Sequence, residues 1–289
     1  MQAANSNASN ASINSMVSKV IFVIVILIAL YYLYRFLYTP SDLQGASVLT
    51  EVSPANPGAA YTFSSNSKTG PSIPAIYEGG EYSVNTWIYI NDYSINRGQN
   101  KHVLNIGGSS FTSLVLFLGP YKNSLSVRVQ TRSPGGVNSA SSADNSNNLT
   151  TSAVQQLFTT LQSDSSLLDT NSPCDIQTVD LQKWVQVTVA LNNKTCDVYM
   201  DGKLARSCVL PSFYRVDKSN LQMKLCDYNG FGGFVSNTSA YNYALNPEQV
   251  WRLYMAGPGA QYSFTQYISG LFNPSSTMKF DYPKQNITS

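Results

Sequence analysis

The sequence predicts an all-β protein, an antiparallel sandwich with a short C-terminal helix, preceded by one apolar N-terminal helix. Three observations lead to this prediction. Short runs of alternating apolar and polar residues recur from Glu81 onward, as expected of half-buried strands. The pair Asp201-Gly202 separates two such runs, which is a strong hairpin signal. The sequence pattern does not alternate strands with long helices, so a parallel α/β fold is not expected.

The apolar helix is predicted over residues 16–38, a stretch of 23 residues that is long enough to cross a bilayer. Residues 20–34 carry no charge and are bracketed by two basic residues, which can snorkel to the lipid headgroups. Tyrosines gather at the C-terminal end, and Pro40 stops the helix. The expected membrane-anchor residues are Lys19, Val20, Ile24, Leu30, Tyr34 and Arg35.

A cleaved signal peptide is the alternative interpretation of this segment. Small residues should then follow the apolar run at a cleavage site. The sequence continues instead as YYLYRFLYTP, which contains no such pattern. We therefore expect an uncleaved, single-pass anchor. Its orientation stays open, because Lys19 and Arg35 lie on opposite sides of the apolar run and the positive-inside rule has nothing further to count.

Composition divides the chain into further segments. Residues 1–15 are polar and of low complexity, so we expect a disordered tail. Residues 39–74 are rich in Ser, Pro, Gly and Ala and are predicted to form a linker or stalk. The β domain is expected over 75–256, with a Ser- and Asn-rich insertion at about 133–170. Residues 257–289 form a C-terminal extension with apolar residues at helix-like spacing.

The β domain is expected to contain many short strands. Beyond the run that begins at Glu81, the alternation is clearest in residues 184–191, where Val and Leu alternate with Gln, Thr and Ala. Asp201-Gly202 is expected to form a type I′ turn, which needs positive φ at both residues. The other predicted strands are Val103 to Ile106, Leu114 to Leu118, Leu125 to Val129, Thr195 to Met200, Lys203 to Leu210, Leu221 to Leu225 and Phe231 to Ser236.

Two short helices are expected beside these strands. The first lies inside the insertion, around Leu157, Phe158 and Leu161. The second begins at Asn246, which has the side chain of an N-cap residue, and is followed by Pro at the first helical position and by Gln249 at the capping-box position. Gly257 is expected to close it.

Two stretches of this domain resemble a known family. LQKWVQVTVALNNKTCDVYMDGKLARSC, from Leu181 to Cys208, resembles the central hairpin of laminin-G-like, concanavalin A-like jelly rolls. GFGGFVSNTSAYNYALNPEQVWRLY, from Gly230 to Tyr254, resembles their last strand and the helix after it. The resemblance implies a jelly-roll sandwich over residues 75–256. The Cys-Val-Leu-Pro run at 208–211 is most similar to the lectin-like proteins coded by large double-stranded DNA viruses, some of which are membrane-anchored virion proteins.

Composition excludes several function classes. The net charge is +2 and charged residues make up 12% of the chain, so the basic field of a nucleic-acid-binding protein is missing. His102 is the only histidine, which leaves little room for a catalytic triad or a histidine metal site. Glycosidases of this fold family place paired carboxylates as Glu-x-Asp-x-(x-)Glu on one strand, and this pattern does not occur. The sequence therefore predicts no enzyme. The four glutamates are Glu51, Glu78, Glu81 and Glu248.

Two kinds of ligand are considered for such a domain. Calcium is possible, because some members of the resembled family bind it through loop residues. The same residue types also favour turns for their own backbone hydrogen bonds, so no metal or cofactor is assigned. A glycan could stack on exposed aromatic rings, but Tyr241 and Tyr243 are expected to serve core or interface packing instead. The calcium candidates are Asp92, Asn96, Asp201, Asp227 and Asn229.

The four cysteines are Cys174, Cys196, Cys208 and Cys226. A two-residue turn at 201–202 pairs residues whose numbers sum to 403, which places Cys196 opposite Ser207 and disfavours a Cys196–Cys208 bond. We expect a Cys208–Cys226 disulfide, with Cys174–Cys196 as the remaining pair. Four buried free thiols stay open as an alternative, and no Cys-x-x-Cys zinc pattern is present.

Two functions follow as hypotheses. The first is a membrane-anchored structural protein, a minor capsid or virion membrane protein of a large DNA virus whose jelly roll contacts other shell proteins. The second is a membrane-anchored lectin at a cell or envelope surface, which predicts an aromatic residue near Asn and Asp side chains in one cluster. The expected partners are a lipid bilayer, other virion proteins or a glycan, and no nucleic acid. Fold alone does not decide between them, because function depends on sites carried by the fold.

Overall fold

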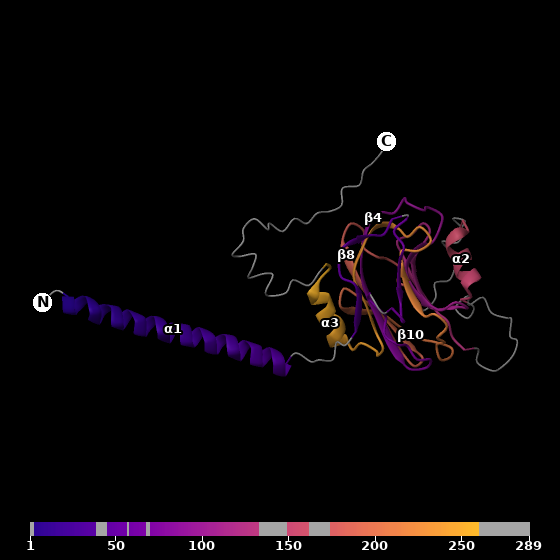
Figure 1. Ribbon diagram of the computed structural model, residues 1–289. Coiled ribbons are helices and arrows are strands. Elements are labelled where there is room, and N and C mark those ends of the chain that lie inside the picture. Colours follow the sequence, from indigo (N-terminus) through magenta and orange to yellow (C-terminus); the bar gives the residue numbers. More distant parts are fainter. Residues whose placement is uncertain are drawn as a thin grey trace. The chain divides into compact units, whose positions relative to one another are not determined.

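The computed structural model describes residues 3–38, 45–56, 58–67, 70–132, 149–161 and 174–259 (Figure 1). The chain divides into two compact units, Met1–Gln44 and Gly45–Ser289. The C-terminal extension from residue 260 lies outside the described residues, as does most of the predicted insertion.

The first unit is the long helix α1, which spans Ala3–Tyr38. Its apolar stretch Met16–Leu33 has a mean hydropathy of 2.5, and none of that stretch is buried by the described chain. The predicted disordered tail of residues 1–15 is wrong from Ala3 onward, where the chain is helical. Residues 3–38 contain no Gly or Pro, so nothing in the backbone breaks the helix before the apolar run begins.

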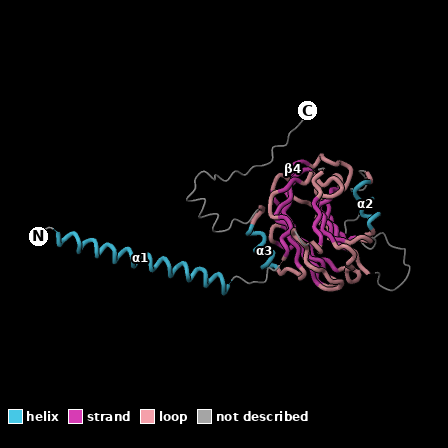
Figure 2. Tube along the Cα trace, viewed as in Figure 1, coloured by secondary structure: helices cyan, strands magenta, loops and turns pink. Residues whose placement is uncertain are grey.

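The second unit is mostly β, as predicted, and contains two antiparallel sheets (Figure 2). Sheet A has seven strands in the order β1-β12-β4-β8-β9-β10, with β2 also paired to β12, and sheet B has five in the order β3-β11-β5-β6-β7. Sheet A consists of β1 (Ala46–Leu49), β2 (Ser53–Pro54), β12 (Gly232–Tyr241), β4 (Glu81–Asp92), β8 (Trp184–Asn192), β9 (Thr195–Met200) and β10 (Lys203–Val209). Sheet B consists of β3 (Tyr61–Ser64), β11 (Gln222–Leu225), β5 (Lys101–Gly107), β6 (Thr112–Leu118) and β7 (Leu125–Val129).

One hydrophobic core joins the inner faces of the two sheets. Val84, Ile88 and Val189 of sheet A belong to the same buried cluster as Leu116 and Met223 of sheet B. Because side chains alternate between the faces of a strand, the polar residues between them point to the outer faces. The unit is therefore a β-sandwich, while its finer assignment to the concanavalin A-like jelly rolls stays a prediction.

The predicted linker over residues 39–74 contains strands from Ala46 onward. β1 and β2 pair with β12, and β3 pairs with β11, so this stretch adds strands to both sheets. Val48, Ala55 and Ile73 are at most 4% exposed. These strands have only two to four residues each, too few for an alternating pattern to be recognised. Position in the sheet, not local sequence, makes them strands.

A short helix covers part of each outer face (Figure 1). α2 (Thr151–Thr159) packs on sheet B, where Val154 and Phe158 join Val115 and Phe117 in a small apolar cluster. α3 (Pro247–Ala256) packs on sheet A, where Tyr254 stacks on Trp87 with ring centroids 5.7 Å apart. The capping box predicted at Asn246 and Gln249 is present at the start of α3, and Gly257 is its C-cap.

The β9–β10 hairpin corrects the predicted disulfide. Met200 pairs with Lys203 across Asp201-Gly202, which both have positive φ, and the register then shifts between Leu204 and Arg206. This bulge places Cys208 directly opposite Cys196. The disulfide joins Cys174 to Cys208, with Cα atoms 5.5 Å apart, and Cys196 and Cys226 are buried free thiols. The expected Cys208–Cys226 and Cys174–Cys196 pairs are therefore both wrong, because the register of the bulged hairpin leaves Cys208 bonded to Cys174.

Candidate functional site

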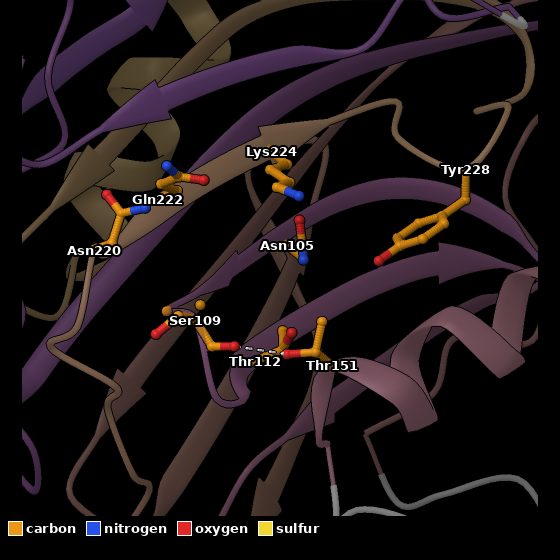
Figure 3. A pocket seen from close by; sticks show the side chains of 10 residues that line it. Asn105, Ser109, Thr112, Thr151, Asn220, Gln222, Lys224 and Tyr228 are labelled. Atoms are coloured by element: carbon orange, nitrogen blue, oxygen red, sulfur yellow. Dashed lines mark hydrogen bonds between the residues drawn. The ribbon is translucent and has the colours of Figure 1, made fainter.

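A polar cleft of about 190 Å³ lies on the outer face of sheet B, next to the start of α2 (Figure 3). Strands β5 and β11, the β5–β6 turn, the first residue of α2 and the segment after β11 contribute to its walls. The lining residues are Asn105, Gly107, Gly108, Ser109, Thr112, Thr151, Asn220, Gln222, Lys224 and Tyr228.

The floor of the cleft follows from strand alternation. Leu104 and Ile106 of β5 are in the core, so the residue between them, Asn105, is turned to the outer face. In the same way Lys224 of β11 lies between two core residues. Asn105 and Lys224 are direct partners in the β5–β11 register. The register therefore brings an amide and an ammonium group, 119 positions apart in the sequence, into one cleft.

A carboxylate holds the β5–β6 turn at the rim. Asp217 accepts hydrogen bonds from the backbone N–H of Ser110 (2.7 Å), of Phe111 (3.4 Å) and of Ser219 (2.9 Å). Burial alone would raise its pKa, but these bonds and one from the Ser219 hydroxyl outweigh burial and hold the pKa at about 2. Gly108 is required here, because a Cβ on it would lie 2.4 Å from the Asp217 Cγ.

The start of α2 is tied to the same turn. The Thr150 side chain caps the helix by accepting a hydrogen bond from the Ala153 N–H (3.3 Å). The Thr151 hydroxyl donates to the carbonyl oxygens of Ser109 (3.1 Å) and Ser110 (3.3 Å). These bonds fix Thr151 as one wall of the cleft, although its helix belongs to the predicted insertion.

Asn105 is the central side chain of the cleft in Figure 3, where it lies below Lys224 and beside Tyr228. It is only 7% exposed. Its carbonyl oxygen Oδ1 makes no hydrogen bond of normal geometry in the described part of the chain, and it interacts weakly with the buried His102 side chain, whose Nε2 also lacks a partner of normal geometry. A buried acceptor without a donor costs about 1–3 kcal/mol. A ligand that donated a hydrogen bond to Oδ1 would recover this energy.

An aromatic cluster supports the Tyr228 side of the cleft. The Phe158 ring of α2 stacks on Tyr228 at 5.1 Å and meets the edge of His102 at 5.0 Å. Burial lowers the pKa of His102 to about 4, so the imidazole is neutral at pH 7. Its Nδ1 accepts a hydrogen bond from the Asp227 N–H (3.1 Å), which leaves the proton on Nε2. Burial and, less strongly, Asp227 raise the pKa of Tyr228, so its hydroxyl stays a donor.

The charges of the cleft are few. The Lys224 ammonium pairs with Asp227 at 3.4 Å, and both side chains are partly exposed. Among the described residues that line the cleft, none carries a carboxylate, thiol or imidazole group. Hydrolysis of a glycosidic bond needs two carboxyl groups beside that bond. The arrangement of amides, hydroxyls, one ammonium and one aromatic ring supports binding of a polar molecule.

The residues considered for calcium are used in turns. The Asp92 carboxylate accepts from the Ser94 N–H (2.8 Å), and Asp201 accepts from the Gln186 N–H (3.0 Å) and pairs with Lys183 (3.2 Å). Asn96 donates to the Asn229 carbonyl at 3.0 Å. Among described residues, the only group of three or more metal-ligating side chains consists of cysteines. No calcium site is assigned.

The remaining predicted residues also have structural contacts. Tyr241 is 4% exposed and packs edge-on against Tyr243 at 5.6 Å. Glu78 pairs with Arg132 at 2.7 Å. Glu81 accepts from the Ala244 N–H at 3.3 Å. The anchor residues Lys19, Val20, Ile24 and Leu30 lie on α1 with exposed side chains, while the side chains of Tyr34 and Arg35 lie outside the described residues.

Sequence reasoning missed most of the cleft. Only Asp227, next to it, was among the candidates. Asn105 and Lys224 do carry a signal, because each is a polar residue between two apolar ones on a predicted strand. That pattern is common to all half-buried strands, so it does not distinguish a binding face from an ordinary solvated face.

No family model matches the chain. No curated protein matches it either. Among solved structures, it is similar to the ligand-binding domain of botulinum neurotoxin serotype D in complex with N-acetylneuraminic acid, at 17% identity and a TM-score of 0.42, over 75% of this chain and 45% of that one. The binding domain of botulinum neurotoxin serotype G is similar at 15% identity and a TM-score of 0.41, over 74% and 47%.

The binding domain of the Paraclostridial mosquitocidal protein 1 is also similar, at 15% identity and a TM-score of 0.37, over 70% of this chain and 42% of that one. This chain therefore spans less than half the length of these solved chains. Similarity at this level carries no argument about this chain, so the site has to be interpreted from its own geometry.

Proposed function

We propose that the β-sandwich is a glycan-binding module held at a membrane by α1. The observation that carries this proposal is the polar cleft on sheet B, lined by the amides of Asn105, Asn220 and Gln222 and by several hydroxyl groups. Amide and hydroxyl side chains that converge in a concave site bind a neutral, hydroxyl-rich ligand through directional hydrogen bonds. The proposal corresponds to the lectin hypothesis from the sequence, with Tyr228 as the aromatic residue near Asn and Asp side chains.

The size of the cleft limits the ligand. A volume of about 190 Å³ is below the ~300–1,000 Å³ that is common for sites of drug-sized molecules. It suits one sugar ring, with the rest of a glycan in solvent. A sugar hydroxyl would donate to Asn105 Oδ1, and the Tyr228 ring offers an apolar face for the C–H side of the sugar.

The membrane part of the proposal rests on α1. The side chains from Met16 to Leu33 that are large and apolar are all 41–67% exposed. Such a helix is unfavourable in water and stable in a bilayer, where its backbone hydrogen bonds are made internally. Replacing Ile24 and Leu30 by Arg should release the chain from carbonate-washed membranes, while the wild type stays bound. A wild-type protein whose N-terminal sequence begins after residue 38 would instead identify α1 as a cleaved signal.

The binding test uses the full chain in detergent on a printed panel of neutral and acidic glycans, followed by calorimetric titration of the best binder. Asn105→Ala should weaken that binding about tenfold, equivalent to ~1.4 kcal/mol. Tyr228→Phe keeps the ring stacked on Phe158 and removes only the hydroxyl, so a smaller loss is expected. The matched control is Tyr77→Phe, because Tyr77 is 61% exposed and does not line the cleft.

Two outcomes would contradict the proposal. One is the absence of binding across the whole panel by a folded, full-length chain. The other is binding that Asn105→Ala and Tyr77→Phe change equally, since the cleft would then not be the binding site.

A second candidate is the structural role, in which the domain contacts shell proteins of a virion as a minor capsid protein. One observation favours a protein contact. β10 pairs only with β9 among the described strands, and its Leu204 and Val209 are 54% and 77% exposed. Exposed apolar side chains on an edge strand can contact another chain, although Lys203, Arg206 and the bulge on β10 oppose direct strand pairing. None of the comparisons points to a viral origin.

Fractionation of the native source distinguishes the two candidates. A structural protein stays with a protein shell in fixed ratio after detergent removes the lipid, and Leu204→Lys with Val209→Lys should release it. A lectin is solubilised by detergent as a separate protein, and those two substitutions should leave its glycan binding unchanged.

A further inference from the structure

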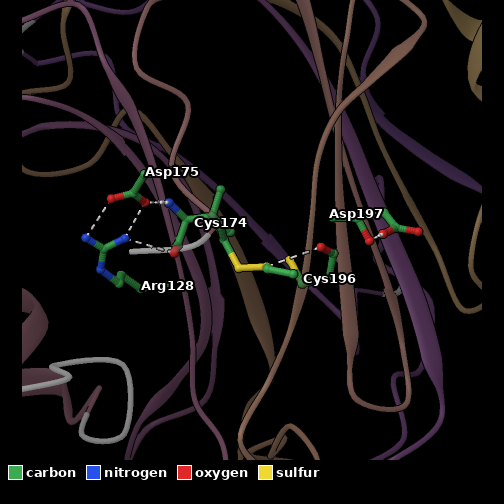
Figure 4. Close-up of a disulfide and its surroundings, with 8 residues drawn as sticks. Arg128, Cys174, Asp175, Cys196 and Asp197 are labelled. Carbon is green, nitrogen blue, oxygen red and sulfur yellow. Dashed lines mark hydrogen bonds and ion pairs between the residues drawn. A yellow bond between two sulfur atoms is a disulfide. The ribbon is translucent and has the colours of Figure 1, made fainter. Parts of the chain in front are cut away.

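Three cysteines meet inside the sandwich, away from the cleft. Cys174 comes from the segment before β8, Cys196 from β9 and Cys208 from β10 (Figure 4). Their Sγ atoms all lie within 4.8 Å of one another. Each side chain is at most 5% exposed. The bulge between Leu204 and Arg206 is what brings Cys208 opposite Cys196 and completes the group.

The disulfide uses only two of these three sulfur atoms. Cys174 and Cys208 are bonded, and Cys196 is left as a buried thiol beside them. The structure therefore places a third sulfur atom beside the disulfide, on the neighbouring strand of the same hairpin.

We propose that Cys174, Cys196 and Cys208 form a site for a thiophilic metal ion of the Zn²⁺ or Cu⁺ type when the disulfide is reduced. Thiolates select these ions over Ca²⁺ and Mg²⁺. With Zn–S bonds of ~2.3 Å, three thiolates around one ion lie about 4 Å apart. The Cys174 and Cys208 sulfurs, which are bonded in the disulfide, therefore move apart after reduction, while all three sulfurs start within 4.8 Å of one another. The metal and the disulfide are alternative ways to satisfy the same sulfur atoms.

Reduction of the Cys174–Cys208 disulfide precedes metal binding. A small dithiol or a phosphine reductant gives two electrons to the Cys174–Cys208 bond, is itself oxidised, and the two sulfurs each take up a proton. Binding of one Zn²⁺ then displaces three protons, one from each thiol, and forms three Zn–S bonds. Affinity therefore rises with pH, because each ligand must lose its proton.

The surroundings of the site fix its ligands. Asp175, next to Cys174, accepts from the Val127 N–H (3.1 Å) and forms a two-bond ion pair with Arg128. Cys196 and Cys208 are adjacent in the β9–β10 ladder. Cys196 and Cys208 are therefore held by the strand ladder, and Cys174 is followed by a residue whose side chain is fixed by an ion pair. These contacts keep the three side chains close together after reduction.

The experiment uses the full chain in detergent, reduced with a phosphine and titrated with Zn²⁺ alone. Native mass spectrometry should show one Zn²⁺ per reduced chain and none per oxidised chain. Co²⁺ used in its place should give visible thiolate-to-cobalt absorption. Cys196→Ser should weaken Zn²⁺ binding at least ~100-fold, and Cys226→Ser is the matched control, since Cys226 is also a buried free thiol but lies outside the group.

Oxidised Cys196→Ser keeps the disulfide, so its circular dichroism spectrum and melting temperature show whether the variant folds. Equal Zn²⁺ binding by the oxidised and reduced chains would overturn the proposal, and so would equal binding by folded Cys196→Ser and Cys226→Ser. A reduced wild type that binds no Zn²⁺ while it keeps its fold would overturn it as well.

Discussion

The outer faces of the two sheets each bury an asparagine, and the two residues are in opposite situations. On sheet A, Asn85 accepts hydrogen bonds from the Gln186 amide and the Thr188 hydroxyl, both at 2.9 Å, and donates to the Asn237 carbonyl at 3.0 Å. On sheet B, the acceptor oxygen of Asn105 makes no hydrogen bond of normal geometry with a described donor and interacts only weakly with His102. Asn85 lies in a closed network, and Asn105 lies in an open cleft.

The two asparagines illustrate two roles that buried polar groups have in a protein. A network whose groups satisfy one another contributes to a unique packing arrangement. A buried acceptor without a donor lowers stability, and it persists in a protein only where something else compensates. The Asn85 network thus serves the fold, whereas the Asn105 acceptor is a group that a ligand would complete. The following predictions, from the largest effect to the smallest, test this contrast.

The largest effect is expected from the disulfide. Cys174–Cys208 ties the end of the segment that carries α2 to sheet A and closes a sequence separation of 34 residues. Cys174→Ser should lower the free energy of unfolding by about 4 kcal/mol through the greater chain entropy of the unfolded state, measured by urea denaturation. Cys226→Ser should cost much less. A larger loss of stability for Cys226→Ser than for Cys174→Ser would instead favour the Cys208–Cys226 disulfide. The segment that carries α2, beside the sheet B cleft, would then not be tied to sheet A by a disulfide.

The next effect depends on pH and belongs to sheet B. His102 has an ordinary pKa of 6.5 when unfolded and about 4 when folded, chiefly because of burial. The unfolded chain therefore binds more protons between these values, so stability falls as the pH drops from 6.5 to 4. Over this range the loss is on the order of 3 kcal/mol.

Urea denaturation at several pH values checks this slope, and His102→Gln should flatten it. Asp217 does not interfere, because its folded pKa of about 2 lies below its ordinary 3.8 and its contribution is lost only as the pH falls from 3.8 towards 2. If His102→Gln left the pH dependence of the unfolding free energy unchanged, a group other than His102 would be responsible for it.

The comparison itself is tested by matched substitutions. Asn85→Ala strands the Gln186 amide, the Thr188 hydroxyl and the Asn237 carbonyl, and should cost about 2 kcal/mol of unfolding free energy. Asn105→Ala removes an acceptor that had no donor, so it should cost less than ~1 kcal/mol. Thermal or urea unfolding of both variants gives the answer. Equal costs would mean that Asn105 is as fully bonded as Asn85, and the contrast between the faces would disappear.

The smallest effect on stability is expected at Lys224. Its ion pair with Asp227 is partly exposed, with side chains 38% and 27% accessible, and such pairs contribute ~0–1 kcal/mol. Lys224→Gln should therefore leave the unfolding free energy within about 0.5 kcal/mol of wild type. Its effect on binding sharpens the proposal, since a loss limited to acidic glycans on the same panel would show that the ammonium contacts a ligand carboxylate.

Local sequence determined much of the fold. The alternation in residues 184–191 reflects the two-residue period of a strand and predicts β8. Asp201-Gly202 has the residue types that positive φ requires, and the capping box at Asn246 satisfies backbone groups within one turn. The apolar run from Met16 to Leu33 forms a helix for an equally local reason, its length without Gly or Pro. All these signals act over a few residues, so they can be identified without a tertiary structure.

The tertiary structure alone decided the strands before residue 75, the cysteine pairing and the cleft. β1, β2 and β3 are too short to have a pattern of their own. The register shift between Leu204 and Arg206 moved Cys208 by one position and reversed the prediction from the turn. Asn105 and Lys224 became neighbours through the β5–β11 register. Each of these depends on which distant strands pair and in which register, and the free energy that selects the pairing comes from the shared core of the two sheets.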